Sequence, residues 1–212
     1  MTAYPHYSHT EERLNVGLHA FGFVLSIAGL FALLLRASSL NSIRAMVSFA
    51  LFGISLMLLY GISTLYHSAQ NPQLRSRLRI ADHASIYVLI AGTYTPFTLV
   101  VLQGSIGWSI FTATWIMALS GIVLKLFYTG RFRLISTLLY VFMGWIIVFA
   151  INPLVDSFDH TGLMWLLAGG VSYTLGAILY SIKRLPLNHA IFHLLVLIGS
   201  ICHFVAVYFY ID

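Results

Sequence analysis

Charged residues are scarce in this chain. Of its 212 residues only 8% are Asp, Glu, Lys or Arg, whereas a soluble domain usually carries about 25%. Hydrophobic residues make up 59% of the chain, and its mean hydropathy is +0.90. A globular core of this size cannot cover so much apolar surface, which excludes an ordinary soluble domain. We therefore expect an integral membrane protein.

Cysteine is nearly absent, and acidic residues are few. Cys202 is the one cysteine of the chain, so an intrachain disulfide is excluded. It lies inside an apolar run. Six acidic residues against 11 basic ones give a formal net charge of +5. Because the basic residues lie between apolar runs, the excess indicates membrane topology rather than nucleic-acid binding. The expected partners are membrane lipids, including a lipid substrate, and no nucleic acid.

Seven apolar runs are long enough to cross a membrane, which takes about 20 helical residues. Polar, Gly- or Pro-containing segments separate them, among them Gln103-Gly104, Thr129-Gly130-Arg131 and an acidic loop at 152–160. We expect no cleaved signal peptide, since the first run is too long for one and Glu11 and Glu12 precede it. The prediction is an all-α, seven-transmembrane helix bundle, with a polar segment at 1–14 and one membrane domain at 15–212. Its spans are 16–35, 45–66, 82–102, 108–128, 134–151, 162–182 and 189–210.

Positive charge is unequally distributed between the two sides of this bundle. With seven spans, the N-terminus and the loops after spans two, four and six lie on one side, which holds nine basic residues against two on the other. Cytoplasmic loops are enriched in Lys and Arg, so we expect a multi-pass inner-membrane protein with a cytoplasmic N-terminus and an external C-terminus. The nine are Arg13, Arg75, Arg77, Arg79, Lys125, Arg131, Arg133, Lys183 and Arg184, and the two are Arg36 and Arg44.

Several polar residues lie at the cytoplasmic ends of the predicted spans. His67 ends the second span, Asp82 begins the third, and His189 and His193 begin the seventh. Ser63 lies one helical turn before His67. The four-residue spacing of His189 and His193 places both imidazoles on one helix face, roughly 6 Å apart along the axis.

This combination of side chains predicts a metal site. Three neutral imidazoles with an open fourth position form the arrangement of a catalytic zinc centre. Asp82 is then either a fourth ligand or a residue that holds the metal-bound water. Zinc lowers the pKa of such a water toward 7 and so produces a hydroxide nucleophile.

Simpler explanations exist for single residues of this set and for others near it. Asp82 alone also suits the N-terminus of a helix, where a carboxylate is favourable. Glu12 is expected to pair with loop arginines. His203 lies ten residues past His193, about 15 Å deeper, and is expected to form a hydrogen bond inside the bundle. Pro96 indicates a kink in the third span.

Four stretches of the chain resemble a known family. They are EERLNVGLH from residue 11, STLYH from 63, DHASIYVLIAGTYTPF from 82 and NHAIFHLLVLIGSICHF from 188. Together they resemble the hemolysin III branch of the progestin and adiponectin receptor (PAQR) family over nearly the whole chain.

The resemblance implies seven helices with a cytoplasmic N-terminus, which agrees with the count of basic residues. It also implies zinc held by His67, His189 and His193, with Asp82 reaching the zinc through water and Ser63 nearby. Related receptors, and alkaline ceramidases of the wider superfamily, imply hydrolysis of a lipid amide. The name hemolysin implies membrane lysis, although nothing in this sequence resembles a pore-forming toxin.

The favoured function is a zinc-dependent hydrolase of a lipid amide or ester near the cytoplasmic leaflet. In it, Asp82 orients or deprotonates the water and Ser63 positions it. A sensor or regulator of membrane state with structural zinc is the alternative, together with a membrane-lytic activity. A transporter or proton pathway through His19 and His203 and a bis-histidine haem protein are further alternatives.

Overall fold

The computed structural model describes residues 7–128 and 133–212 of the chain, and within these residues it contains helices and no β-strand. The predicted break at Thr129-Gly130-Arg131 and the first six residues of the segment 1–14 lie outside them. Seven helical segments are long and apolar enough to cross a membrane. The predicted fold class, an all-α seven-helix membrane bundle, is therefore confirmed. The segments are His9–Ser39, Ile43–Ser68, Pro72–Leu102, Gly104–Tyr128, Leu134–Ser157, His160–Ser181 and Asn188–Tyr210.

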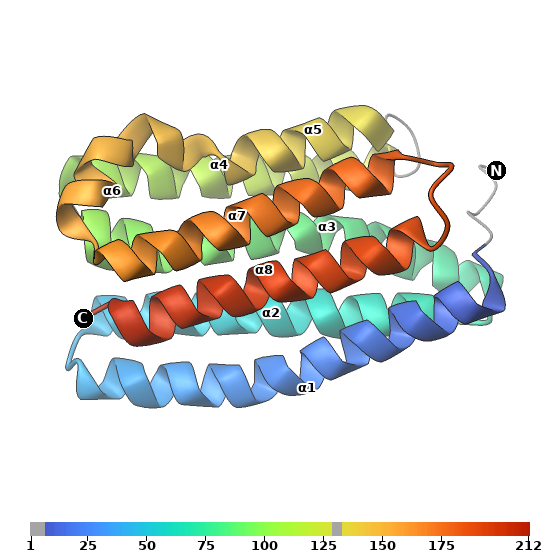
Figure 1. The fold of residues 1–212 in the computed structure, drawn as a ribbon, viewed down its shortest axis with the longest axis horizontal. Helices are drawn as coiled ribbons and strands as arrows, with labels where there is room; N and C mark the ends of the chain where they lie inside the picture. Colours follow the sequence, from blue (N-terminus) through green and yellow to red (C-terminus); the bar gives the residue numbers. More distant parts are fainter. Residues whose placement is uncertain (1–6, 129–132) are drawn as a thin grey trace.

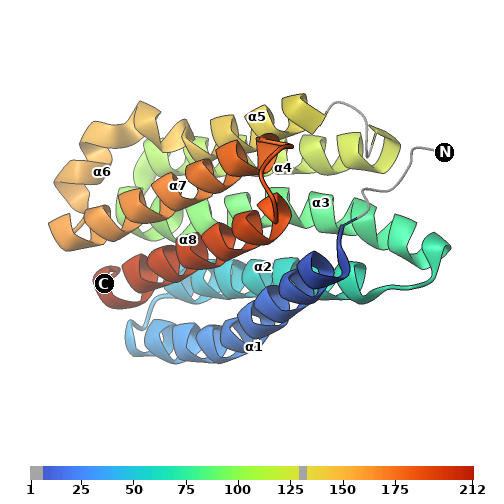
Figure 2. The same cartoon turned by 45° about the vertical axis from the view of Figure 1, so that its right-hand side comes forward.

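The helices form a closed ring around the centre of the bundle. Helix α1 packs against α2 and α8, α2 against α3, α3 against α4, α5 against α3 and α7, and α7 against α8 (Figures 1 and 2). The start of α1 and the end of α8 lie at opposite ends of the bundle (Figure 1). The helices are α1 (His9–Ser39), α2 (Ile43–Ser68), α3 (Pro72–Pro96), α4 (Gly104–Tyr128), α5 (Arg133–Gly144), α6 (Ile151–Ser157), α7 (His160–Ser181) and α8 (Asn188–Tyr210).

Helix α3 begins ten residues earlier than the sequence predicts. The side chain of Asn71 accepts hydrogen bonds from the backbone N–H groups of Gln73 and Leu74, and Pro72 occupies the first position, where its missing N–H has no cost. Asp82 therefore lies well inside the helix, and the explanation of Asp82 as an N-terminal cap is wrong. Hydropathy placed the start at the edge of the apolar run, but a polar first stretch can be helical when it is capped.

The third span changes its hydrogen bonding at Pro96. This residue has no N–H to donate, and α3 ends there and continues as a wider π-helical segment, η1 (Phe97–Leu102). The turn into α4 follows at Gln103 and Gly104, with φ values of 44° and 53°. The predicted irregularity at Pro96 and the predicted turn both coincide with these breaks.

The fifth span is longer than predicted. Helix α5 is followed by a short 3-10 segment, η2 (Ile146–Ala150), and then by α6, which continues to Ser157. The expected loop at 152–160 is thus wrong over residues 152–157, which are helical. Pro153 lies in the first turn of α6, where the missing N–H and fixed φ of proline are tolerated. Proline here marks a new helix start rather than a loop.

The buried core holds α2 between α1 and α8. Phe49, Phe52 and Tyr60 of α2 are at most 1% exposed, and they pack with Leu33 of α1 and Val207 of α8. Large apolar side chains are exposed on the outside of the bundle, as a surface in contact with lipid requires. The fold therefore joins α2 and α8, which carry the histidines, through one buried apolar cluster.

Candidate metal centre

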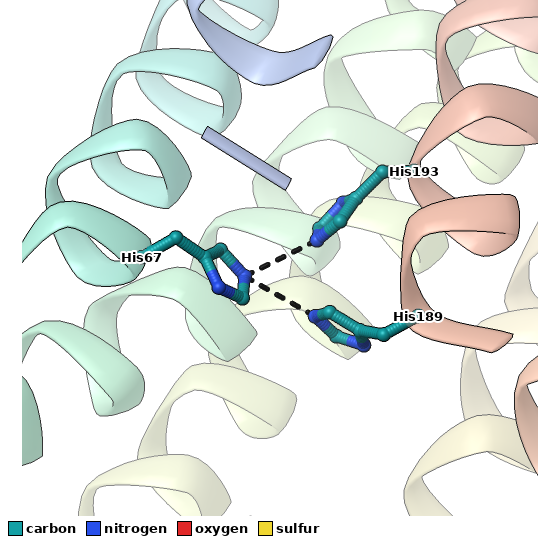
Figure 3. Close-up of side chains that lie close together, drawn as sticks. All are labelled: His67, His189 and His193. Atoms are coloured by element: carbon teal, nitrogen blue, oxygen red, sulfur yellow. Dashed lines mark hydrogen bonds between the residues drawn. The ribbon is translucent and has the colours of Figure 1, made fainter. Parts of the chain in front are cut away.

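Three histidines from two helices meet at one end of the bundle. His67 lies in the last turn of α2, and His189 and His193 lie in the first two turns of α8 (Figure 3). The Nε2 atom of His67 is 3.2 Å from the Nε2 atoms of both His189 and His193. All three side chains are buried, and one ring nitrogen from each lies within 4.8 Å of the others. These three residues could hold a metal ion.

The spacing of the nitrogens fits a small tetrahedral metal ion. Zinc binds imidazole nitrogen at about 2.0–2.1 Å, which places two ligands of one tetrahedron about 3.3 Å apart. The two distances of 3.2 Å agree with this value. Imidazole nitrogen is also a donor that suits zinc. Since the two α8 ligands occupy one face of one helix, the site needs only α2 and α8 to be in the correct register.

A contact deeper in the bundle sets that register. The hydroxyl of Tyr60 on α2 donates to Oγ of Ser200 on α8, at 2.7 Å. The two helices are antiparallel. His67 follows Tyr60 by seven residues, and His193 precedes Ser200 by seven residues. The two histidines therefore lie at the same height along the bundle. The displacement is two turns, or about 10 Å, along both helices. A slip by one residue on either helix would separate the histidines.

Glu12 joins His67 to two other helices. Its Oε2 lies 2.7 Å from Nδ1 of His67, and its Oε1 accepts a hydrogen bond from Arg75 at the start of α3. Because a carboxylate only accepts, the proton lies on Nδ1, which leaves the lone pair of Nε2 directed toward the other histidines. A carboxylate on the far nitrogen is the usual partner of a metal-binding histidine. The predicted pairing of Glu12 with a loop arginine is also present, with Arg75.

Glu11 caps the start of α8, the helix that carries the other two histidines. Helix α8 starts after Leu187, whose left-handed backbone (φ 55°) carries no capping side-chain hydrogen bond. Instead, Oε1 of Glu11 on α1 accepts from the backbone N–H of His189 at 3.2 Å. A carboxylate at this position satisfies a free N–H and is stabilised by the helix dipole. Adjacent glutamates of α1 therefore contact both helices that supply histidines.

Asp82 and Ser63, the two residues expected to assist the site, are both buried. Asp82 of α3 is 8% exposed and lines the same cavity as His189 and His193. The ligand cluster found among the described residues consists of the three histidines and does not include Asp82. Ser63 is fully buried one turn before His67, and its hydroxyl has no hydrogen-bond partner among the described residues.

A cavity of about 170 Å³ extends from the histidines into the bundle. His189 and His193 form part of its wall, and the remaining wall is mostly aromatic and aliphatic. Such a cavity holds far more than a single water molecule. Its deeper wall includes Ile90, Tyr94, Trp145, Tyr173 and Val196.

Two aromatic side chains cover the histidines and were not expected from the sequence. Tyr7, which precedes α1, stacks on His189 with ring centroids 4.6 Å apart. His19 of α1 contacts His193 edge-on, at 3.7 Å between centroids. Burial raises the pKa of the Tyr7 phenol above its ordinary value, so this hydroxyl stays protonated. The signal available in the sequence was the spacing of Glu12, Asn15 and His19, which places one face of α1 toward the site.

His203 takes no part in the cluster, as expected from its depth. Its Nδ1 donates to the carbonyl of Gly199 in the preceding turn of α8, at 2.8 Å, and its ring stacks on Tyr173. Its hydrogen-bonding inside the bundle is therefore local. It lines the cavity two to three turns deeper than the metal centre.

Comparison with known proteins covers nearly the whole chain. The family described as Haemolysin-III related matches residues 7–204. The chain is 45% identical to Hemolysin-3 of Bacillus cereus over 201 residues, which is 95% of this chain and 92% of the relative. It is 44% identical to the Hemolysin-3 homolog of Bacillus subtilis (strain 168) over 200 residues, 94% of each chain. A human relative, Monocyte to macrophage differentiation factor, is 29% identical over 210 residues, 95% of this chain and 84% of its own.

Proposed function

The chain belongs to the Haemolysin-III related family of multi-pass membrane proteins, and from this premise we propose that it binds zinc and hydrolyses an amide or ester bond of a membrane lipid. The predicted family and membrane location are confirmed. The observation that carries the proposal is the group of three buried imidazoles, two of which, those of His189 and His193, line the wall of a largely apolar cavity. Three histidines that leave a fourth position open are typical of catalytic rather than structural zinc.

His67, His189 and His193 would hold the zinc ion through Nε2. A zinc ion bound there would supply Lewis acidity, which polarises a carbonyl group and makes water a stronger nucleophile. Glu12 would keep the ring of His67 in the required orientation and tautomer through its hydrogen bond to Nδ1. The chain itself must then provide a proton acceptor and a place for the lipid.

Asp82 is suited to accept the proton. It is the one carboxylate among the described residues that line the cavity, which His189 and His193 also line. It would take a proton as water adds to the carbonyl carbon, and would return it to the departing nitrogen or oxygen as the acyl bond breaks. Ser63, with its unpaired hydroxyl, would hold the water or the carbonyl oxygen by a hydrogen bond.

The cavity is suited to the apolar part of a lipid. Most of its wall is aromatic and aliphatic, with side chains such as Ile90, Trp145 and Val196 that suit an acyl chain. The excess of Lys and Arg on the same side favours a site near the cytoplasmic leaflet. A substrate drawn from that leaflet would present its head to the histidines and its chain to the bundle interior.

The proposal is tested by metal analysis and turnover on the purified protein. We expect about one zinc per chain, lost in His67→Ala and His193→Ala and retained in the matched control His160→Ala, an exposed histidine. Turnover is then measured on a panel of ceramides, acylglycerols and phospholipids. Full metal content in His193→Ala would remove the basis of the zinc centre. Zinc without turnover on any lipid would contradict the hydrolase.

A second candidate is a membrane-state sensor in which zinc ties α2 to α8. The observation in its favour is the number of contacts, through Glu11, Glu12 and Arg75, that connect the histidines to α1 and α3. In that case zinc content would change the conformation without any lipid being cleaved. Lysis, to which the name Hemolysin-3 of the Bacillus cereus relative refers, is a separate outcome that release of haemoglobin from erythrocytes would detect.

A further inference from the structure

One histidine lines the cavity far from the candidate metal centre. His203 is 5% exposed and lies ten residues after His193 on α8, which is about 15 Å deeper along the helix axis. Its Nδ1 donates to the carbonyl of Gly199. In a neutral imidazole the second nitrogen then carries a lone pair, so Nε2 is a hydrogen-bond acceptor. This nitrogen has no hydrogen-bond partner among the described residues.

Two glycines make room for this ring and for the ring beside it. A Cβ on Gly169 of α7 would lie 2.2 Å from Nδ1 of His203, and a Cβ on Gly199 would lie 2.6 Å from Cδ1 of Tyr173. The rings of His203 and Tyr173 stack with centroids 5.1 Å apart and an interplanar angle of 15°. Close packing of α7 against α8 thus fixes the orientation of the His203 ring.

Hydrogen bonds fix Tyr173 in turn. Its hydroxyl is 3.0 Å from Oγ of Ser200 on α8, and the same Oγ accepts from the hydroxyl of Tyr60 on α2 at 2.7 Å. Tyr60 and Ser200 are both buried. Three helices therefore hold the wall around His203, and the histidine belongs to a rigid polar cluster rather than to a loose surface.

Other polar groups of the deep wall have their partners within the protein. The indole N–H of Trp145 donates to Oγ1 of Thr174, and the hydroxyls of Thr174 and Tyr94 donate to backbone carbonyl groups. These donors are used, whereas the acceptor Nε2 of His203 is not. A molecule that binds here must therefore supply a hydrogen-bond donor.

The depth of His203 sets the position of that donor on a lipid chain. An extended chain advances about 1.2 Å per bond, as an extended polypeptide does. The distance of about 15 Å between the levels of His193 and His203 thus corresponds to about twelve bonds. A lipid whose carbonyl group lies at the three histidines would bring a carbon near the twelfth position to Nε2. A donor on that carbon would pair the buried acceptor, which is unfavourable when it is left unpaired.

We propose that Nε2 of His203 is the acceptor of a second polar subsite, which binds a hydroxyl group near the middle of a lipid chain. The position of the lipid head at the candidate metal centre rests on the proposed function, but the subsite needs neither zinc nor hydrolysis. It assigns the substrate class, a lipid with a hydroxylated chain. A keto group on the same carbon only accepts hydrogen bonds and so cannot replace the hydroxyl.

The test compares two fatty acids that differ in their ability to donate. Octadecanoic acids with a hydroxyl or a keto group on carbon twelve are titrated into the purified protein in neutral detergent, and native mass spectrometry measures their binding. We expect the hydroxy acid to bind about tenfold more tightly, because the keto acid leaves Nε2 unpaired and places two acceptors together. Equal binding to the wild-type protein would mean that water satisfies Nε2, and would overturn the proposal whatever the variants do.

A variant then locates the preference. His203→Phe, which keeps an aromatic ring and removes the acceptor, should abolish the preference for the hydroxy acid. The matched control His160→Phe, which replaces an exposed histidine of α7, should leave it unchanged. A folded His203→Phe protein that keeps the tenfold preference would contradict the subsite.

The position of the hydroxyl gives a comparison that needs no variant. Hydroxyl and keto groups on carbon three would lie near the histidines instead of near His203, so the wild-type protein should not show the tenfold preference between them. An equal preference at carbon three would place the hydroxyl at the histidine end and overturn the subsite.

A last arm separates the subsite from the proposed hydrolase. In His67→Ala, which lacks a proposed zinc ligand, the preference at carbon twelve should persist because His203 is intact. Its loss would tie the preference to the candidate metal centre and overturn the subsite. Absence of turnover with a persistent preference contradicts only the proposed hydrolase.

Discussion

The carboxylate of Glu12 lies 2.7 Å from Nδ1 of His67, although 55 residues separate them in the chain. The same carboxylate bonds Arg75, so α1, α2 and α3 meet at one side chain. The contact fixes which nitrogen of His67 faces the other histidines. It makes the first turn of α1 a part of the candidate metal centre and not only an interfacial segment.

Glu12→Gln should weaken zinc binding without abolishing it. The amide cannot stabilise the Nδ1 proton as a carboxylate does, and changes to such partners typically cost 10–100-fold in metal affinity. Competition with a chromophoric chelator measures the affinity. Asp156→Asn, which removes an exposed carboxylate of α6, is the matched control and should be neutral. Unchanged affinity in Glu12→Gln would mean that His67 is held by its packing alone.

Asp82→Asn should retain zinc and lose turnover. The amide keeps the shape of the side chain but cannot accept the proton, and removal of a general base usually costs about 10²–10⁴-fold in rate. Metal content and kcat are measured on the same preparation, on the lipid identified by the panel. Turnover at the wild-type rate would exclude Asp82 as the proton acceptor, and loss of zinc would instead make it a ligand.

Removal of zinc should lower the thermal stability of the protein. A ligand present at about 100 times its Kd stabilises the native state by about 2.7 kcal/mol, which corresponds to several degrees in Tm for a chain of this size. Differential scanning fluorimetry with and without a chelator measures the shift. His193→Ala should show no shift, and an equal shift in that variant would indicate a metal site elsewhere.

Gly53→Ala should destabilise the contact between α1 and α2. A Cβ at this position would lie 2.6 Å from Cδ1 and 3.1 Å from Cα of Leu30, so the helices must separate. Overpacking of this kind costs about 1–3 kcal/mol. Gly17→Ala is the control, because a Cβ there meets nothing within 4 Å and helix propensity alone should make it neutral or stabilising. Equal unfolding temperatures for the two variants would show that α1 shifts freely, and then zinc affinity should also be insensitive to Gly53→Ala.

The helix bundle and the group of three histidines could be predicted from the sequence, for physical reasons. Length and hydropathy identify spans because a helix must cover a hydrocarbon layer of fixed thickness. The alternation of seven spans then places the end of the second and the start of the seventh on one side, and the four-residue spacing places His189 beside His193. No pairing between distant segments had to be guessed.

The contacts that hold the histidines in place could not be predicted from the sequence in the same way. Glu11 contacts the backbone of His189 across 178 residues of sequence, and Tyr7 reaches the same histidine. Such contacts depend on how α1 packs against α2 and α8, which no periodicity specifies. The early start of α3 was missed for a different reason. Asn71 and Pro72 begin the helix ahead of the apolar run, so the start of the helix and the start of the apolar run differ.

Because His67 is far from His189 and His193 in the sequence, the three-histidine cluster can form only after α8 has been synthesised. Between His67 and His189 the ribosome adds 122 residues, which takes on the order of ten seconds at usual rates of synthesis. During that interval His67 has been synthesised, and so has its partner Glu12, but His189 and His193 have not. A metal ion held by all three histidines could therefore bind only late in the biogenesis of this protein, after the last helix has been inserted and packed.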